Sequence, residues 1–327
     1  HPEMPRDEVL ACLEARSISY KILDEDDKML ALEIEIGEGE LVSYLSRRLS
    51  MTFFIDEFYY SCEAAKDVIV GNAPKIQIPT GKKFRITAYR TRSRHKHFSL
   101  TQTVNELGAA IKGAANLSKP DIDVVLALTN KAFVGRRIYE FIRGDFDARG
   151  MDKRPFSVPI SLHPRIAMAM VNLSRIGEGQ TLLDPFCGTG GILMEAHRAG
   201  AKLIGSDIDP RMIEGTARNL RHFKIGATVF QSDIADVPEH VAAPVDAIVT
   251  DLPYGRASST HKQEILALYD KAFATFAKTL KSGGRAVVGM SEEDRIKIGE
   301  KYLKLEKVYP VRVHKSLTRY FCVYVKG

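Results

Sequence analysis

The segment Leu182-Leu183-Asp184-Pro185-Phe186-Cys187-Gly188-Thr189-Gly190-Gly191 is the most informative part of this 327-residue chain, because an apolar strand ends there in a glycine-rich turn. In open α/β sheets, ligands bind beyond the carboxyl ends of the strands, and glycine lets the backbone approach them closely. A dinucleotide-binding turn would read Gly-x-Gly-x-x-Gly, a spacing that this segment lacks. S-adenosylmethionine, which has no phosphate, suits the turn better. The alternative is a tight strand-to-helix turn that binds nothing.

Strands and helices alternate around this turn. We expect helices over residues 163–175, 191–199, 210–223 and 263–280, and strands over 181–183, 202–206, 228–231, 245–250 and 285–290. Such an alternation predicts a doubly wound, largely parallel sheet. Two late strands, 305–313 and 320–326, have little helix between them and favour an antiparallel edge hairpin.

Three further acidic residues lie at or just after the ends of strands of this unit. Asp207 ends the second strand, 23 residues after Asp184, where a carboxylate accepts hydrogen bonds from ribose hydroxyls. Asp209 precedes Pro210 and is instead expected to cap the next helix. Asp233 follows the third strand, where it is placed either to accept from an adenine amino group or to serve as an ordinary turn residue.

The segment Asp251-Leu252-Pro253-Tyr254 follows the fourth strand and lies 67 residues after Asp184. An aromatic amine is a poor nucleophile. A carboxylate and a carbonyl oxygen that accept hydrogen bonds from its two N–H groups favour the geometry that the nitrogen needs for attack. Asp251 and the Leu252 carbonyl are the expected acceptors, and Tyr254 is expected to stack on the base. Alone, the tetrapeptide would be a turn with proline, but behind a glycine-rich first turn it indicates amino-group methylation.

Composition narrows the class of protein. The chain is 45% hydrophobic and 27% charged, and no apolar run has the length of a spanning helix, so we expect a globular protein with no membrane role. The four cysteines form no Cys-x-x-Cys pair, which favours a reducing cytoplasm over a disulfide framework. No histidine spacing or carboxylate cluster indicates a metal. The N-terminus, His1-Pro2, has no initiator methionine or signal pattern, so we expect that residues are missing there.

Charge divides the chain into three parts. Residues 1–65 carry 6 Lys and Arg against 15 Asp and Glu, residues 66–150 carry 16 against 7, and residues 151–327 carry 25 against 19. The first part reads as a small α+β unit, the second as another α+β unit that ends near 141, and the polar, breaker-rich segment 144–155 as a linker. The basic middle part is therefore the candidate for contact with a polyanion.

The basic charges of the middle part concentrate within fifteen residues, which no acidic residue interrupts. A period-two alternation over residues 82–92 predicts a strand with one basic face. We expect this run to bind phosphate with a marked salt dependence. Its cations are Lys82, Lys83, Arg85, Arg90, Arg92, Arg94 and Lys96.

Four motifs carry a family resemblance. They are Asp184 to Gly191, Gly205-Ser206-Asp207-Ile208-Asp209-Pro210-Arg211-Met212, Thr250 to Arg256, and Arg312-Val313-His314-Lys315-Ser316-Leu317-Thr318-Arg319. Together they closely resemble the tRNA guanine-N2 methyltransferases that act at position 10 and carry a THUMP domain. The resemblance covers essentially the whole chain, and the last motif is the most family-specific.

The resemblance implies an α/β fold with a C-terminal Rossmann-like class I methyltransferase domain behind α+β ferredoxin-like and THUMP domains. The expected units are a ferredoxin-like domain at 1–65 whose first strand would lie upstream of His1, a THUMP RNA-binding domain at 66–143, a linker at 144–155 and the methyltransferase at 156–327. The implied activity is methylation of a guanine N2 in tRNA by S-adenosylmethionine, with one or two methyl groups added.

The residues implied for this activity form three groups. The catalytic group is Asp251, Leu252, Pro253 and Tyr254. The cofactor-binding group is Asp184, Pro185, Phe186, Cys187, Gly188, Thr189, Gly190, Asp207, Ile208 and Asp233, with residues 156–164 over the cofactor's methionine end. The RNA-binding group adds Arg256, His314 and Lys315 to the basic run, although these three are equally typical of solvated loops.

Three alternatives stay open. The first is a sister enzyme that acts on another guanine of tRNA, because the tetrapeptide does not encode which nucleotide reaches it. The second is an adenine-N6 DNA methyltransferase, which the basic α+β unit disfavours, and the third is an RNA-binding module with a vestigial cofactor fold. One departure is that Leu252 stands where the family has proline, which restores a backbone N–H. Some relatives work with a small zinc-binding activator protein, and no motif here reveals whether this chain does.

Overall fold

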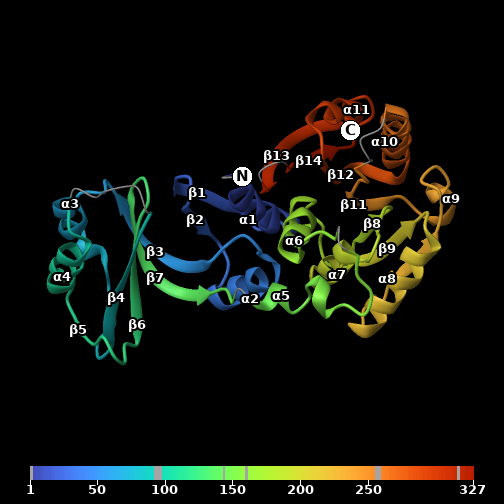
Figure 1. Cartoon of the computed structure of the whole chain (residues 1–327). Helices are drawn as coiled ribbons and strands as arrows, with labels where there is room; N and C mark the ends of the chain where they lie inside the picture. Colours follow the sequence, from blue (N-terminus) through green and yellow to red (C-terminus); the bar gives the residue numbers. More distant parts are fainter. Residues whose placement is uncertain (1–2, 92–97, 143, 159–160, 255–258, 315–316) are drawn as a thin grey trace.

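The computed structural model describes residues 3–91, 98–142, 144–158, 161–254, 259–314 and 317–327. These residues form three sheets (Figure 1). A seven-stranded sheet with its helices makes up one end of the molecule, a five-stranded sheet the other, and the N-terminal helix and hairpin lie between them. Among the described residues, no helix is long and apolar enough to cross a membrane.

The seven-stranded sheet confirms the expected α/β fold. Its order is β10-β9-β8-β11-β12-β14-β13, parallel from β10 to β12 and antiparallel at β14 and β13. The late hairpin is also confirmed, with the last strand between β12 and the edge strand β13. The strands are β8 (Thr181–Asp184), β9 (Lys202–Asp207), β10 (Thr228–Gln231), β11 (Val245–Asp251), β12 (Leu280–Met290), β13 (Lys304–His314) and β14 (Leu317–Val325).

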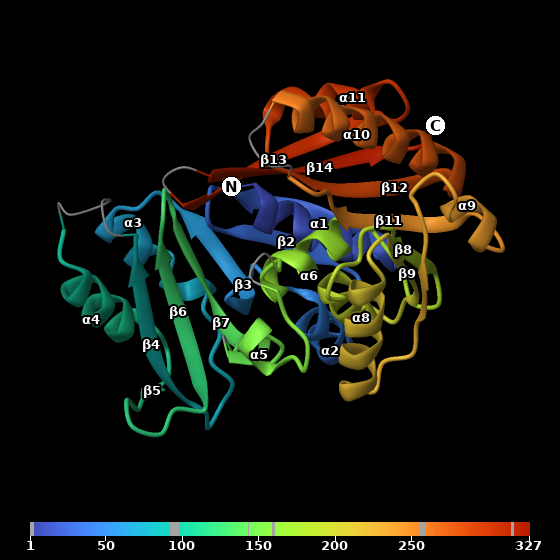
Figure 2. The same cartoon turned by 45° about the vertical axis from the view of Figure 1, so that its right-hand side comes forward.

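Helices cover both faces of this sheet (Figure 2). Neighbouring residues of one strand enter different cores, since Leu182 packs with α6 and α7 whereas Leu183 packs with α10. This alternation is the mark of a sheet buried on both sides. The helices are α6 (Pro164–Leu173), α7 (Gly191–Arg198), α8 (Pro210–His222), α9 (Val237–His240), α10 (Ser259–Thr279), η3 (Glu293–Arg295) and α11 (Ile296–Glu300).

The five-stranded sheet has helices on one face. Its order is β3-β7-β6-β4-β5, and α3 and α4 bury a core around Phe84 and Leu107. The strands are β3 (Phe54–Cys62), β4 (Lys83–Arg90), β5 (Ala114–Ala115), β6 (Ile122–Leu128) and β7 (Ala132–Glu140), and the helices are α3 (Lys66–Gly71), η1 (Ala73–Lys75) and α4 (Leu100–Ala110). The sequence pattern predicts a helix over residues 101–116, but α4 ends at Ala110. It stops there because Ile111 is extended and buried and the chain then adds β5 beside β4.

The N-terminal unit consists of α1 (Met4–Ala15), β1 (Tyr20–Glu25), β2 (Leu30–Ile34) and α2 (Glu38–Arg48). The strand β3, which lies on the N-terminal side of the expected boundary at 65, is hydrogen-bonded to β7. The strand β3 therefore belongs to the sheet of the second unit. Local sequence patterns do not predict backbone pairing between segments this far apart in the chain.

The segment expected as a linker is packed against the C-terminal unit. It contains α5 (Gly144–Asp147) and η2 (Met151–Lys153), and Arg149 forms a two-bond ion pair with the buried Glu195 of α7 at 2.9 and 3.0 Å. The polar, breaker-rich composition predicts a linker, and the ion pair with a partner 46 residues further on attaches this segment to α7.

A buried polar network joins the N-terminal unit to the C-terminal one. Asn172 of α6 donates to Glu8 of α1 at 2.8 Å and accepts from Arg48 of α2 at 2.9 Å. Glu8 also accepts from Ser50 and from the Met51 backbone N–H at 2.6 and 2.9 Å. Because each buried polar group has partners, the network fixes the two units relative to each other.

Candidate active site

The acidic residues singled out by sequence lie at one edge of the seven-stranded sheet. Asp184, Asp207 and Asp251 are the last residues of β8, β9 and β11, and these strands are parallel neighbours. Asp233 follows β10, the next strand outward. The strand order therefore brings together groups that lie up to 67 residues apart in sequence.

The glycine-rich turn has the backbone conformation that glycine supports. Gly188 and Gly190 have φ values of 50° and 78° in the left-handed region, which side chains other than glycine rarely adopt. A Cβ atom on Gly188 would meet nothing within 4 Å, whereas one on Gly190 would lie 3.0 Å from Thr216. Gly188 thus presents open space to a ligand, and Gly190 allows α8 to pack closely.

Side chains outside the turn hold it in place. Asp207 accepts from the Gly188 N–H at 3.0 Å, and Thr216 donates to the Gly188 carbonyl at 2.6 Å. Asn219 donates to the Thr189 carbonyl at 2.9 Å and exchanges bonds of 2.9 and 2.8 Å with the Phe156 backbone. Thr216 and Asn219 are not among the predicted site residues, although their i, i+3 spacing on one face of α8 is a signal for them.

Asp184 lies beneath the turn. Its side chain is 1% exposed, accepts from Thr250 at 2.7 Å, and accepts a longer bond from the Phe186 N–H at 3.3 Å. Burial raises the pKa of Asp184 to about 7. Cys187 is also buried, and its N–H donates to the Ser206 carbonyl at 2.9 Å. These two residues, expected to bind cofactor, support the loop from below.

Asp207 is half-buried and positioned by backbone groups. Besides the Gly188 N–H it accepts from the Asp209 N–H at 3.0 Å, and burial raises its pKa. A carboxylate has about four acceptor positions, so capacity remains for a ligand hydroxyl. Asp209 accepts from the Arg211 N–H at 2.9 Å, which confirms it as the N-cap of α8. The intervening Ile208 is 64% exposed, an unusual state for a large aliphatic side chain.

Asp233 lies at the rim of this edge. It accepts from the Ala235 N–H at 2.9 Å, which is the main cause of its lowered pKa, and from Lys271 at 3.4 Å. The bond to Ala235 is that of an ordinary turn. Both interpretations of Asp233 therefore stay open.

Asp251 is surrounded by two side chains. Tyr254 donates its hydroxyl to the two carboxylate oxygens at 2.8 and 2.7 Å, and Arg319 of β14 forms an ion pair with the second oxygen. The arginine carbon Cζ also lies 4.9 Å from the Tyr254 ring centroid. Burial raises the pKa of Asp251 to about 6, and Arg319 opposes this rise.

The backbone of the tetrapeptide is anchored on three sides. The Leu252 N–H donates to the Gly289 carbonyl at 3.0 Å and so extends the pairing with β12. Tyr269 donates to the Pro253 carbonyl at 3.0 Å, and Arg295 donates to the Tyr254 carbonyl at 3.2 Å. The Leu252 side chain is 1% exposed and belongs to the core, which leaves its backbone for the predicted role.

Arg319 is the most important residue that sequence reasoning did not assign to the site. It stands at the end of the most family-specific motif, so its presence there was the available signal. The pattern of this motif is typical either of a loop that contacts phosphate or of a solvated hairpin tip, whereas Arg319 is buried on the strand and forms an ion pair with Asp251. Antiparallel pairing of β14 with β12 brings the two residues together.

The basic strand lies far from this edge, on the five-stranded sheet (Figure 1). Lys82 and Arg85 form exposed ion pairs with Asp121 and Asp123 at 3.4 and 2.8 Å, so neighbouring carboxylates offset part of the basic face. Lys83, also on this strand, is exposed.

Several residues of the RNA-binding prediction fall outside the described part of the chain. Arg92, Arg94, Lys96, Arg256 and Lys315 lie outside the described residues, as does the side chain of His314. Arg90, the last cation of β4, donates to the Phe98 carbonyl at 2.9 Å.

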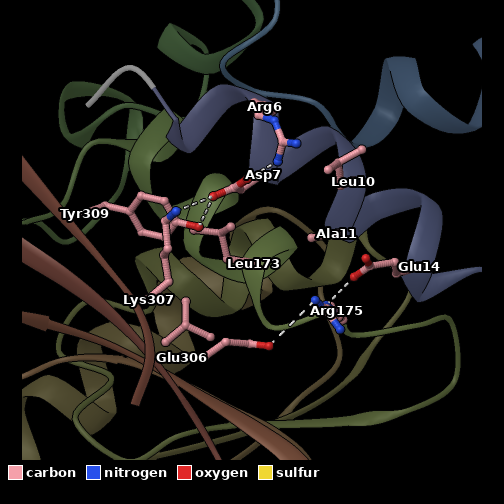
Figure 3. A pocket seen from close by; sticks show the side chains of 11 residues that line it. Arg6, Asp7, Leu10, Ala11, Glu14, Leu173, Arg175, Glu306, Lys307 and Tyr309 are labelled. Atoms are coloured by element: carbon pink, nitrogen blue, oxygen red, sulfur yellow. Dashed lines mark hydrogen bonds and ion pairs between the residues drawn. The ribbon is translucent and has the colours of Figure 1, made fainter. Parts of the chain in front are cut away.

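A cavity of about 270 Å³ lies between α1, the end of α6 and β13 (Figure 3). Its charged lining is paired, with Arg175 2.5 Å from Glu14 and Tyr309 2.8 Å from Asp7. Paired charges attract a ligand weakly, and the lining contains none of the residues at the strand ends. We interpret this cavity as part of the joint between the units.

Comparison with known proteins places the chain among methyltransferases. The model of the RMKL-like methyltransferase domain matches residues 151–320, more than half of the chain. The tRNA (guanine(10)-N2)-dimethyltransferase of Methanothermobacter thermautotrophicus is 32% identical, over 98% of this chain and 95% of that protein. The protein of the same name from Pyrococcus abyssi is 40% identical, over 64% of this chain and 63% of that protein.

A solved structure shares the fold. TrmN from Thermus thermophilus superimposes with a TM-score of 0.55, covering 97% of this chain and 96% of that chain at 18% identity. The likeness extends beyond the C-terminal sheet and includes the N-terminal units.

Proposed function

Because this chain belongs to the family of the tRNA (guanine(10)-N2)-dimethyltransferases, we propose that it methylates the N2 amine of guanine 10 in tRNA with S-adenosylmethionine. The observation that carries the proposal is the position of Asp251. It ends β11 beside the glycine-rich turn of β8, with an aromatic ring three residues further on. This arrangement sets a hydrogen-bond acceptor for an amine next to a loop fit for the cofactor.

The residues around the turn fit S-adenosylmethionine. Gly188 leaves space for the ligand, Asp207 retains acceptor capacity for ribose hydroxyls, and the exposed Ile208 offers an apolar surface to an adenine ring. Pro185, Phe186, Thr189 and Asp233 complete the proposed contacts. When bound, the cofactor supplies an electrophilic methyl group.

Asp251 and the Leu252 carbonyl are proposed to accept the two N–H groups of the guanine amine. Holding both hydrogens favours the nitrogen geometry needed for attack and positions the lone pair. When the amine nitrogen takes the methyl group, the bond between the methyl carbon and the cofactor's sulfur would break and leave a neutral thioether. The alkylated nitrogen would then be acidic and would lose its proton to solvent or to Asp251. A pKa of about 6 suits Asp251 to both roles, because the residue is ionised near neutral pH yet accepts a proton readily.

Access of guanine to Asp251 requires a movement of Tyr254. Both carboxylate oxygens accept from the tyrosine hydroxyl, so an incoming amine must replace that bond. The released ring is then proposed to stack on the base, and Pro253 is proposed to fix the turn. Arg319 stays on Asp251 as a positioning residue that keeps the carboxylate ionised.

The five-stranded sheet is proposed to be a THUMP domain that binds the body of the tRNA. The exposed cations of β4 and the basic residues that follow it support this role, because tRNA is held largely through phosphates and shape. Arg256, His314 and Lys315 are proposed to contact RNA near the active site. The cytoplasm is the proposed location, in keeping with four free cysteines. A small zinc-binding activator protein is the proposed protein partner, and the dependence of methylation on it is part of the test below.

The proposal is tested with unmodified tRNA transcripts and methyl-labelled S-adenosylmethionine, with and without an activator, followed by nucleoside analysis. We expect N2-methylguanosine or its dimethyl form, and the relatives' name favours the latter. A transcript with inosine at position 10 lacks the amine and should accept no label. Label at another guanine would indicate the sister activity, and label in duplex DNA instead of tRNA would contradict the proposal.

A further inference from the structure

Arg154 is a buried cation beside the glycine-rich turn with a donor left over. It is 6% exposed, and its Nε donates to the Arg149 carbonyl at 3.0 Å. Its Nη1 lies 3.4 Å from the Thr189 hydroxyl. Its Nη2 is buried without a hydrogen-bond partner in the described part of the chain. An unpaired buried donor is costly, so a missing acceptor is the natural explanation.

The nearby acidic group is already engaged. Glu195 is fully buried, and Arg149 occupies both of its oxygens. Burial lowers the pKa of Arg154, Glu195 opposes this, and repulsion from Arg149 adds to it. One carboxylate thus faces two arginines at this place. The uncompensated charge favours an anionic ligand.

The spare donor stands where the cofactor is proposed to lie. The Arg154 Nη1 and Nη2 atoms are 3.1 and 3.6 Å from where a Cβ on Gly191, the first residue of α7, would be. The Thr189 hydroxyl is 3.2 Å from that of Ser161. Ser161 donates to the Val158 carbonyl at 3.0 Å, so the spare hydrogens here are those of Arg154. The guanidinium lies at the N-terminal end of an eight-residue helix, an end that favours negative charge.

We propose that Arg154 binds the carboxylate of the cofactor's methionine moiety through its Nη2 and Nη1 groups. A guanidinium matches a carboxylate in shape and charge, and the adenosine end is already assigned to Asp207 on the neighbouring strand. The inference rests on the proposed function, since it takes S-adenosylmethionine as the ligand.

The test compares two ligands by calorimetry in wild-type protein and Arg154→Gln. One ligand is S-adenosylmethionine, and the other is its decarboxylated form, which lacks only the carboxylate. We expect Arg154→Gln to weaken binding of S-adenosylmethionine about 10- to 100-fold and binding of the decarboxylated ligand less than about twofold. If both ligands weaken equally, or neither weakens, the inference is overturned.

Matched variants complete the design. Arg198→Gln removes another half-buried arginine that Glu195 attracts, but at the far end of α7, and should leave both affinities unchanged. If Arg154→Gln does not fold, Arg154→Lys carries the test, with a smaller loss confined to S-adenosylmethionine. A wild-type protein that binds neither ligand would contradict the proposed function itself, whereas normal wild-type binding with an indifferent variant would contradict only the role of Arg154.

Discussion

Asp251 is the residue on which the chemistry depends, and its pKa is set by burial and by one neighbour, Arg319. Burial raises its pKa above the usual value, and Arg319 lowers it from what burial alone would produce. Because the carboxylate form accepts the amine hydrogens, activity should fall as pH drops through about 6, the pKa of this residue.

Replacing Arg319 with glutamine should move this acid limit upward. The substitution removes the cation that opposes the effect of burial, so the pKa of Asp251 rises further. We expect the acid limb of the kcat/KM profile to shift by about one pH unit or more, and Arg319→Lys to restore part of the shift. An equal loss of activity at every pH would mean that Arg319 has only a structural role.

Tyr254 is expected to act through its ring and not through its hydroxyl. Tyr254→Phe removes the hydroxyl that occupies the carboxylate of Asp251, and it should keep kcat/KM for tRNA within about threefold of wild type. Tyr254→Ala removes a stacking surface worth about 1–3 kcal/mol, a loss of about 5- to 150-fold. Steady-state kinetics on both variants check this, and a phenylalanine variant as damaged as the alanine variant would contradict it.

The identities of the strand-end residues were predictable from sequence, but their partners were not. Each of these residues, Asp184, Asp207 and Asp251, ends an apolar strand. Parallel pairing places the carboxyl ends of the three strands at one edge of the sheet. Arg319 reaches Asp251 across 68 residues through antiparallel pairing, and Arg154 reaches the turn from the expected linker. Local patterns carry no information on such contacts.

At the scale of elements, the pairing of β11 with β12 places Asp251. Gly289 is the register partner of Asp251, and a Cβ there would lie 2.4 Å from the carboxylate oxygen Oδ1. A side chain at this position must therefore displace the carboxylate. The site therefore requires a residue without a side chain at Gly289.

Gly289→Ala should lower kcat for tRNA methylation at least about tenfold, because a displaced acceptor misplaces the amine. Binding of S-adenosylmethionine should stay normal, since the substitution lies on β12 and the turn follows β8. Gly226→Ala is the control, as a Cβ there meets nothing within 4 Å. Calorimetry and single-turnover rates distinguish the two effects, and a fully active Gly289→Ala enzyme would contradict this placement.

Most helices and strands matched their sequence periodicity to within a few residues. The exceptions share one cause. The helix α4 stops short because Ile111 is buried in an extended conformation, and β3 pairs with β7 across the expected boundary. In both cases tertiary packing decides what local propensity leaves open.

At the scale of the whole molecule, the joint through Asn172 fixes the N-terminal unit on the C-terminal one. Its amide group donates a hydrogen bond to Glu8 and accepts one from Arg48, and both of these side chains are buried. The five-stranded sheet, which is proposed to bind tRNA, is connected to the C-terminal unit through this joint. The rigidity of the joint therefore determines the distance between the bound tRNA and Asp251.

Asn172→Ala should leave two buried charged groups short of partners and lower the midpoint of thermal unfolding by about 5–10 °C. It should also reduce kcat/KM for whole tRNA more than affinity for S-adenosylmethionine. Asn72→Ala, which removes an exposed bond at the end of α3, is the control. Unchanged stability and tRNA kinetics would show that the joint is not required.

The charge distribution alone predicts a division of the chain into three parts. An acidic first part, a basic middle part and an α/β end correspond broadly to the three sheets. How the parts dock is not visible there, since the joint depends on single polar residues such as Asn172, which composition does not distinguish from surface asparagines.

The central claim is that Asp251 holds the guanine amine, and the single-turnover rate of Asp251→Ala tests it most directly. With saturating S-adenosylmethionine and unmodified tRNA, we expect methyl transfer to slow at least about 100-fold while cofactor affinity stays within about threefold of wild type. An Asp251→Ala enzyme that transfers the methyl group at a near-normal rate would contradict the account.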